Sequence, residues 1–260
     1  MAEVLRIEEL QGVAWLTMNR PERLNALNPE LATALRTYFQ GLYTRPEVRV
    51  VVLQGAGKAF CAGLDLKDQP EGRALGAEGM YAVQRSIRDI MLAMRRCPQP
   101  IVSLVQGAAS GGGFALALAS DVRLATPDAR MNAAFIRIGL TGCDMGVSYF
   151  LPRMVGSSVA AEYLLTGRFM DAARAHALGL FSRVAPLPEL HQEAEALVAD
   201  MLRVNPLGLR LTKEGLGHAI DAGSLDAVIA LEDRQQVLCT QSEHFGEGMR
   251  AFLEKREPRY

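Results

Sequence analysis

One segment, residues 105–121, constrains the fold of this chain more than any other. It reads Val-Gln-Gly-Ala-Ala-Ser-Gly-Gly-Gly-Phe-Ala-Leu-Ala-Leu-Ala-Ser-Asp, so an apolar strand turns through three consecutive glycines into a helix rich in alanine and leucine. Glycine lacks a Cβ, so the backbone can take a positive φ and a ligand can reach bare N–H groups. The following helix directs its free N–H groups and positive dipole end at the same place. The segment therefore favours a site that stabilises a developing negative charge.

The common glycine motifs do not fit this segment. A dinucleotide fingerprint counted from Gly111 needs a glycine where Leu116 stands. The phosphate-loop pattern fails at Gly55-Ala-Gly-Lys58, which lacks the earlier glycine of that motif. A nucleophile elbow around Ser110 needs glycine at Ala108. On these residues alone, close packing of the helix explains the glycines equally well.

Composition narrows the class of protein. A chain of 260 residues, 49% of them hydrophobic, suffices for one large domain with a substantial core. The formal net charge of -1 and the lack of a long basic run predict no nucleic-acid partner. Glycine or charge interrupts every apolar stretch before the ~20 residues of a membrane span. The acidic N-terminal segment resembles neither a signal nor a transit peptide, so we expect a cytoplasmic protein without a membrane partner.

Metal-binding residue types are scattered along the chain. The cysteines are Cys61, Cys97, Cys143 and Cys239, and the histidines are His176, His191, His218 and His244. None has the close spacing of a metal-ligand pair, and the cysteines do not suggest the disulfide framework of a secreted protein. We expect no metal site.

Alternating strand and helix patterns predict an α/β fold with parallel crossovers. Strands are expected at 4–7, 13–18, 48–54, 101–105 and 122–125, with a hairpin turn at 11–12. A helix is expected from Pro29, capped by Asn28, and another over 80–96. The polar segment 67–79 is predicted to be a mobile lid rather than packed structure. Helices begin near 157, 171 and 187, and the chain from 205 onward is helical and ends in an amphipathic segment.

Four motifs follow one another along the chain. They are Asn19-Arg-Pro-x-x-Leu-Asn-Ala-Leu27, Phe60-Cys-Ala-Gly-Leu-Asp-Leu66, Gln106-Gly-x-x-x-Gly-Gly-Gly113 with Asp121, and Glu247-Gly-Met-x-Ala-Phe-Leu-Glu-Lys-Arg256. In this order they resemble the enoyl-CoA hydratase/isomerase family, the crotonase superfamily, from end to end. The resemblance implies a crotonase-like spiral of ββα units over 1–200. It also implies a helical C-terminal trimerisation region over 201–260 and a homotrimer or a dimer of trimers.

The resemblance further implies an acyl-CoA thioester as substrate, with no other cofactor. The backbone N–H groups of Leu64 and Gly112 would hold the thioester oxygen, and losing one such donor typically raises the barrier by ~3 to 4 kcal/mol. Residues near the CoA moiety would be Arg23, Leu24, Ala62 and Lys67, with Phe252 and Lys255 reaching a neighbouring subunit's ligand. A solvated surface charge is the alternative for Lys67 and Lys255. Asp65 is expected to anchor its loop.

The chain departs from the family's hydratases at the two positions where they carry catalytic glutamates. Ala115 and Phe135 stand there, and neither side chain can move a proton. Asp144 is the nearby carboxylate, and isomerase-type members of the family keep an aspartate in this loop. A single base can shift a β,γ double bond to α,β, and burial beside an acyl chain would raise its pKa. The alternative for Asp144 is a turn residue that satisfies loop N–H groups.

Other functions remain open at this point. A hydratase could use Asp144, or a lid carboxylate such as Asp68 or Glu78, in place of the missing glutamates. A non-catalytic acyl-CoA-binding homologue would use the same glycine loop only to recognise thioesters. The lid at 67–81 and the helix after it are expected to form the acyl pocket.

Overall fold

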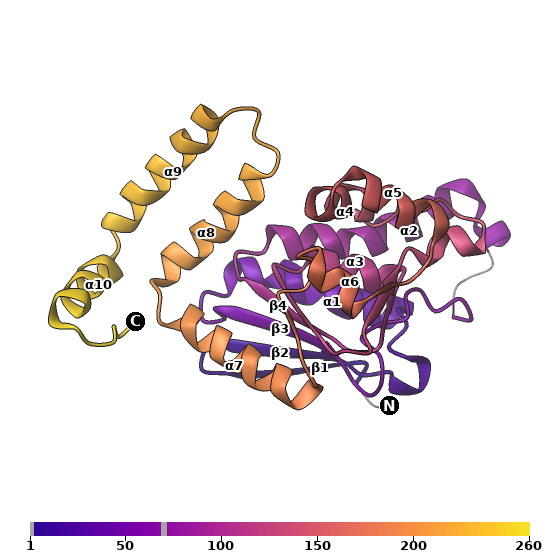
Figure 1. Cartoon of the computed structure of the whole chain (residues 1–260), viewed down its shortest axis with the longest axis horizontal. Helices are drawn as coiled ribbons and strands as arrows, with labels where there is room; N and C mark the ends of the chain where they lie inside the picture. Colours follow the sequence, from indigo (N-terminus) through magenta and orange to yellow (C-terminus); the bar gives the residue numbers. More distant parts are fainter. Residues whose placement is uncertain (1–2, 69–71) are drawn as a thin grey trace.

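A six-stranded sheet forms the centre of the molecule in the computed structural model, which describes residues 3–68 and 72–260 (Figure 1). Its strand order is β1-β2-β3-β4-β6-β9, and all neighbours are parallel except β1 and β2. The strands are β1 (Leu5–Leu10), β2 (Val13–Met18), β3 (Val50–Gly55), β4 (Ile101–Val105), β6 (Val122–Ala125) and β9 (Arg183–Val184). This is the α/β arrangement with parallel crossovers that the sequence predicts.

Each face of the sheet packs against helices. In β3, Val51 and Leu53 enter the large core under α1, α2 and α3, whereas Val50 and Val52 face α7 on the other side. This alternation explains why β3 reads as a continuous apolar run, because both of its faces are buried. The helices are α1 (Pro29–Gly41), α2 (Gly72–Arg96), α3 (Gly112–Ala119) and α7 (Leu187–Leu202).

A second, smaller sheet carries the glycine turn toward the site. Its strands are β5 (Ala108–Ser110), β7 (Arg130–Asn132) and β8 (Met170–Asp171). The 3-10 helix η3 (Ala134–Ile138) follows β7, and α4 (Val147–Val155), α5 (Ser157–Thr166) and α6 (Ala172–Ala177) complete this part of the chain. The remaining 3-10 turns are η1 (Pro21–Arg23) and η2 (Leu42–Thr44).

Most predicted elements occur where the sequence places them. The Asn28 side chain accepts a hydrogen bond from the Leu31 N–H at 2.9 Å and so caps α1, as predicted. The first strand extends further than predicted, to Leu10. The prediction of an irregular lid is wrong from Gly72 onward, because α2 begins there and bends at Gly76, whose φ is +62°. Residues 69–71 of that lid lie outside the described part of the chain.

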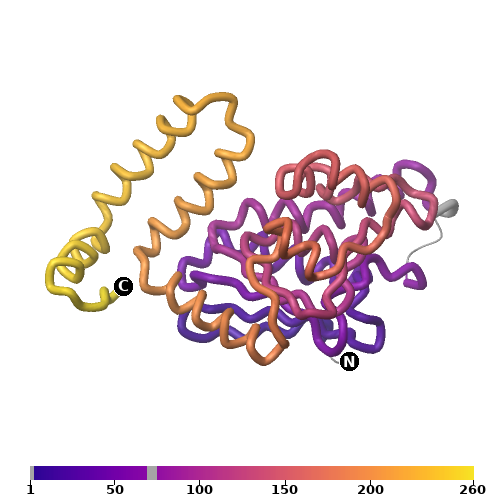
Figure 2. Tube along the Cα trace, viewed as in Figure 1, coloured from indigo at the N-terminus to yellow at the C-terminus, as the bar shows by residue number. Residues whose placement is uncertain are grey.

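Three C-terminal helices project away from the sheet as an arm: α8 (Pro206–Ala219), α9 (Leu225–Thr240) and α10 (Glu243–Glu254) (Figure 1). In Figure 2, α8 and α9 run side by side and α10 turns back. An ion pair joins Arg203 to Glu257 at 3.5 Å. Helix α9 has no buried residue. Across 3–68 and 72–260, no helix combines the length and the apolar character that crossing a membrane requires.

Candidate active site

Two glycine-containing loops, 60–65 and 106–113, pack directly against each other. The Cys61 N–H donates to the Ala108 carbonyl at 3.0 Å, and the Ser110 N–H donates to the Cys61 carbonyl at 2.9 Å. Gly63 has a φ of +97°, and a Cβ on it would lie 2.7 Å from the Ser110 carbonyl oxygen. A Cβ on Gly113 would overlap the Cys61 carbonyl. The glycines are therefore required by the close approach of the two loops as well as by any ligand.

The Leu64 N–H group is left free by the pairing of its loop. Leu27 pairs with the residues on either side: its N–H donates to the Gly63 carbonyl at 2.7 Å. Its carbonyl in turn accepts from the Asp65 N–H at 3.0 Å. Among the described residues, the Leu64 N–H has no hydrogen-bond acceptor.

The Gly112 N–H group is free for a different reason, since it belongs to the first turn of α3. The hydrogen bonds there are made by neighbours, with the Gly111 N–H donating to the Asn132 carbonyl at 2.9 Å. No acceptor for the Gly112 N–H occurs in 3–68 or 72–260. A Cβ on Gly63 would lie 3.4 Å from the Gly112 nitrogen, so the two free donors lie on adjoining loops. The positive end of α3 adds a favourable potential for an anion there.

Asp144 lies between η3 and α4 and is half-buried. Its Oδ1 accepts from the Met145 N–H at 2.7 Å and from the Gln84 side chain of α2. Burial raises the pKa of Asp144 above its usual value, and these two hydrogen bonds oppose the rise only in part. The next residue, Met145, has a φ of +47°, so the backbone beside the carboxylate adopts a conformation that costs energy for a residue with a Cβ.

Ala115 and Phe135 are both apolar and buried. Ala115 is fully buried, and Phe135 is 4% exposed. The Phe135 ring packs against Gly111, where an added Cβ would lie 3.4 Å from Cε1. Neither position offers a group that exchanges protons.

A buried cation holds the loop that carries Leu64. Arg20 donates to Asp65 Oδ2 at 3.0 Å and to Asp68 Oδ2 at 2.9 Å. Burial alone would raise the pKa of Asp65, but the hydrogen bonds from Arg20 and the Lys67 N–H outweigh it and the pKa is lowered. Asp65 thus has the geometry of a loop anchor. Asp68 is paired with this arginine, and Glu78 is exposed.

Sequence reasoning missed the parts played by Arg20 and Asn25, although both belong to the first quoted motif. Asn25 is fully buried with a φ of +55°. Its amide donates to the Ala59 carbonyl at 2.7 Å and to the Ala56 carbonyl at 2.9 Å, and its Oδ1 accepts from the Arg20 N–H. An asparagine followed by small residues after a proline turn was the available signal, since asparagine tolerates a left-handed backbone.

The residues expected around CoA fall into two groups. Leu24 and Ala62 are adjacent, because the Ala62 N–H donates to the Leu24 carbonyl at 3.0 Å, and Arg23 and Lys67 are exposed on the same pair of loops. Phe252, which is 81% exposed, belongs to α10, and Lys255 caps the end of that helix. Helix α10 lies at the far end of the arm (Figure 1). A single chain therefore does not bring Phe252 and Lys255 close to the other residues expected around CoA.

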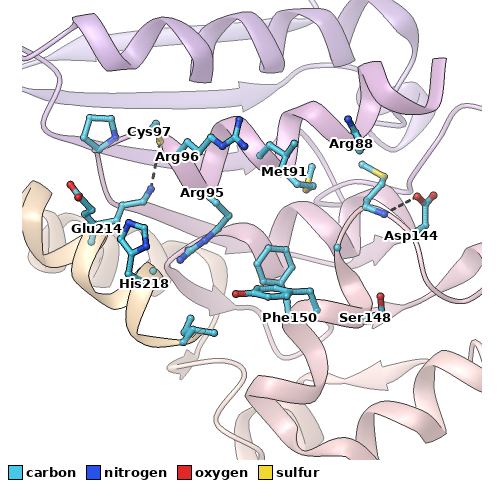
Figure 3. A pocket seen from close by; sticks show the side chains of 18 of the residues that line it. Arg88, Met91, Arg95, Arg96, Cys97, Asp144, Ser148, Phe150, Glu214 and His218 are labelled. Carbon is cyan, nitrogen blue, oxygen red and sulfur yellow. Dashed lines mark hydrogen bonds between the residues drawn. The ribbon is translucent and has the colours of Figure 1, made fainter. Parts of the chain in front are cut away.

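A cavity of about 940 Å³ opens beside Asp144, between α2, α4 and α8. Figure 3 shows Asp144 and Arg88 at one end and Glu214 and His218, from α8, at the other. Met91, Leu92 and Phe150 supply apolar surface between them. The expectation that the lid at 67–81 lines this pocket is wrong for residues 75–81, because the described α2 lining begins at Gln84. The contribution of α8 was not predicted.

Met145 connects this cavity with the two free N–H groups. Among the described residues, neither Leu64 nor Gly112 lines the cavity, but Met145 does. Its Sδ would lie 3.4 Å from a Cβ on Gly112. An acyl group that occupies the cavity would therefore pass Met145 before reaching the two donors.

The described residues offer little support for a metal site or for a cysteine nucleophile. Groups of three or more His, Cys, Asp or Glu that would hold a metal ion do not occur in the described ranges. Cys61 lies in the site loop, but burial raises the pKa of its thiol to about 12, so it is not a nucleophile at neutral pH.

Comparison with known proteins agrees with this geometry. The family model described as enoyl-CoA hydratase/isomerase matches residues 8–260. A Mycobacterium bovis protein named "Probable enoyl-CoA hydratase echA12" is 38% identical over 253 residues, which cover 95% of this chain and 88% of that one. The Escherichia coli "1,2-epoxyphenylacetyl-CoA isomerase" is 34% identical, covering 100% of this chain and 99% of its own.

A solved structure supports the same assignment. The crystal structure of an enoyl-CoA hydratase from Bacillus anthracis superposes with a TM-score of 0.93 at 30% identity, over 99% of this chain and 98% of that one. The chain is thus of the crotonase fold class, a mixed α/β fold built around a mostly parallel sheet. It belongs to the enoyl-CoA hydratase/isomerase family.

Proposed function

We propose that this protein is an enoyl-CoA isomerase that moves a β,γ double bond of an acyl-CoA thioester to the α,β position. Asp144 is the base, and the N–H groups of Leu64 and Gly112 hold the thioester oxygen. The acyl-CoA is the substrate, and the reaction needs no further cofactor.

The observation that carries the proposal is the position of the Asp144 carboxylate. Asp144 is half-buried at the end of a cavity, with a raised pKa, while Ala115 and Phe135 occupy the positions expected to hold a hydratase's glutamates. Hydration needs a group that activates water and a group that delivers a proton. Isomerisation needs only one group that takes a proton and returns it, and a raised pKa favours the return.

The proposed steps balance without another reactant. Asp144 removes the α-proton of the β,γ-enoyl thioester, and the bonding electrons move onto the thioester oxygen to form a dienolate. The Leu64 and Gly112 N–H groups stabilise this oxyanion, because they are fixed before the charge develops. The protonated Asp144 then returns the proton to the γ-carbon. The α,β-enoyl thioester forms with no change in mass.

Binding of the rest of the ligand is proposed on the same pair of loops. Arg23, Leu24, Ala62 and Lys67 would contact the nucleotide and pantetheine, and Phe252 and Lys255 would come from a neighbouring copy in a homotrimer or a dimer of trimers. The proposed division is a catalytic spiral over 1–200 and an oligomerisation region over 201–260. Large exposed apolar side chains on the arm support it, namely Leu225, Val237, Leu238, Phe252 and Leu253.

The test is a spectroscopic assay of wild type and Asp144→Asn with matched β,γ- and α,β-enoyl-CoA esters, including one with a ring in its acyl group because one relative is named for such a substrate. Conversion without mass change, slower by ~100-fold or more in the variant, is expected for a lost general base. The asparagine keeps the side-chain volume and the two hydrogen bonds to Oδ1, so a folding defect is not expected. Full activity of Asp144→Asn would contradict the proposal.

The second candidate function is hydration, which the names of several relatives favour. It predicts a product heavier by one water. Asp144 is the preferred candidate to activate the water, because Asp68 is paired with Arg20 and Glu78 is exposed. Tight binding of both esters without conversion would favour a non-catalytic acyl-CoA-binding protein over either enzyme.

A further inference from the structure

The hydrogen bonds of Asp144 are unevenly divided between its two oxygens. The Gln84 side chain and the Met145 N–H both donate to Oδ1. Within residues 3–68 and 72–260, Oδ2 accepts no hydrogen bond. Since Asp144 lines the cavity, Oδ2 is the oxygen with lone pairs available to a bound acyl group.

We propose that Gln84 is a positioning residue that holds Asp144 Oδ1 against its two protein donors. Oδ2 alone then carries the proton between the two carbons of the substrate. The inference rests on the proposed function, in which Asp144 is the base. It goes further because it assigns a role to a residue of α2, on an element 60 positions away in the sequence.

The chemistry of a carboxyl group explains why this arrangement suits a proton shuttle. When Oδ2 takes the proton, Oδ1 becomes the carbonyl oxygen of a neutral acid and still accepts hydrogen bonds. Both donors therefore remain bonded in both protonation states. The carboxyl group does not need to rotate between removal of the α-proton and delivery to the γ-carbon.

A neutral donor also preserves the basicity of Asp144. Its pKa is raised by burial and lowered only by these two hydrogen bonds. Other charged and titratable groups line the same cavity. They are Arg88, Arg95 and Arg96 on α2, Tyr149 on α4, Arg210, Lys213, Glu214 and His218 on α8, and Tyr43, Cys97 and Cys143 outside these helices. None of them is among the causes of the Asp144 shift. A cation in place of Gln84 would orient the carboxylate equally well but would stabilise the anion and weaken the base.

The experiment compares Gln84→Met, which keeps the length of the side chain but removes the donor, with Gln84→Glu and the control Arg85→Gln. Arg85 is the next residue on α2, is exposed, and does not line the cavity. For each variant, kcat and KM for the β,γ-enoyl-CoA ester, the pH profile of kcat/KM and the melting temperature are measured.

Gln84→Met is expected to lower kcat by ~10-fold or more while KM changes less than ~2-fold, because positioning of a general base acts on the chemical step. The acidic limb of its pH profile should move to higher pH, since the Asp144 anion loses a donor. Gln84→Glu should move the limb further in the same direction, because two adjacent carboxyl groups resist double ionisation. Arg85→Gln should match wild type.

Several outcomes overturn the inference. A wild-type kcat and an unmoved limb in Gln84→Met, with Asp144→Asn inactive, would refute the role of Gln84 and leave the proposed function standing. A loss of activity that only follows a lower melting temperature, with the limb unmoved, would show a structural role. If Gln84→Met does not fold, the limb of Gln84→Glu decides alone, and an unmoved limb refutes the inference. Full activity in Asp144→Asn would refute both proposals.

Discussion

Two buried cations each stabilise a different region of this molecule, and the networks around the two cations differ. Arg20 is 8% exposed and holds the glycine-containing loop 60–65, where it binds Asp65 and Asp68. Lys213 is 6% exposed and fastens the arm to the core. Its ammonium group donates to the Gln99 carbonyl at 2.7 Å and the Met94 carbonyl at 3.0 Å, and pairs with Asp121 at 3.0 Å.

The difference lies in what remains when each cation is removed. Without Arg20, the Asp65 side chain keeps one hydrogen bond within the described ranges, from the Lys67 N–H. Without Lys213, Asp121 still accepts from Arg95 at 2.7 Å and from the Ile101 N–H at 2.8 Å. Loss of Arg20 therefore takes most of the partners of Asp65, whereas Asp121 keeps two partners when Lys213 is lost.

The largest effect is expected from Arg20→Met. Removing one partner of a buried ion pair leaves an uncompensated charge, so the free energy of unfolding should fall by about 3 kcal/mol. The loop that carries Leu64 should shift as well, and kcat should fall with stability. Urea denaturation and the isomerase assay measure the two effects.

The sign of the pH dependence checks the cause. Because the pKa of Asp65 is lowered in the folded state, its contribution is present above the usual carboxyl pKa and disappears as pH falls through the lower, folded value. The difference between Arg20→Met and wild type should therefore shrink in acid. Arg45→Met, at an exposed pair with Glu9, is the control and should cost less than ~1 kcal/mol. An equal loss of unfolding free energy for both arginines would show that burial of Arg20 does not make its ion pairs more important for stability.

Lys213→Met should have a smaller effect on global stability, about 2 kcal/mol, because hydrogen bonds from a charged group are lost but no carboxylate is left unpaired. Its effect should be local to the arm. Amide hydrogen exchange in α8 and cleavage by protease near residues 203–206 should both become faster, while exchange in the sheet is unchanged. Uniformly faster exchange throughout the core would show that the arm is part of the same cooperative unit.

This contrast also describes what the sequence could predict. Residues 105–121 and 60–66 form local patterns, and their strand, turn and helix follow from glycine, alternation and capping within a few neighbours. The cavity does not follow from a local pattern, because Asp144 contacts Gln84 across 60 positions and Lys213 contacts Met94 across 119. Such pairs are set by packing of distant elements, so Asp144 was a candidate from the sequence, but its partner Gln84 and the cavity wall formed by α8 were not predicted. The helix that begins at Gly72 was missed because glycine is normally unfavourable in helices, and one glycine inside it, Gly76, marks a bend.

Within the core, Asp144 and Asp65 should respond to pH in opposite directions. Because burial raises the pKa of Asp144, the folded state holds its proton more tightly than the unfolded chain, so the contribution of this group to stability falls as pH rises from the usual carboxyl pKa through the raised one, and stays low above it. Asp144→Asn should therefore melt at a slightly higher temperature than wild type at pH 7. The gain should vanish below about pH 4, where the aspartate is neutral in both states. A lower melting temperature at pH 7 would indicate that the charged form is stabilised in the fold.

The smallest effect on folding is expected from Phe252→Ser in the arm. This side chain is 81% exposed in the single chain, so its loss should change the free energy of unfolding of an isolated chain by less than ~0.5 kcal/mol. If the arm packs against a second copy, as proposed, the same substitution removes apolar area from that interface. Sedimentation velocity over a range of protein concentrations should then show dissociation in the variant at concentrations where wild type remains assembled. The matched control is Phe39→Ser in α1, whose ring is 1% exposed, and which should destabilise the fold itself. An unchanged assembly in Phe252→Ser would place the interface elsewhere and would leave the exposed phenylalanine without a partner in another subunit.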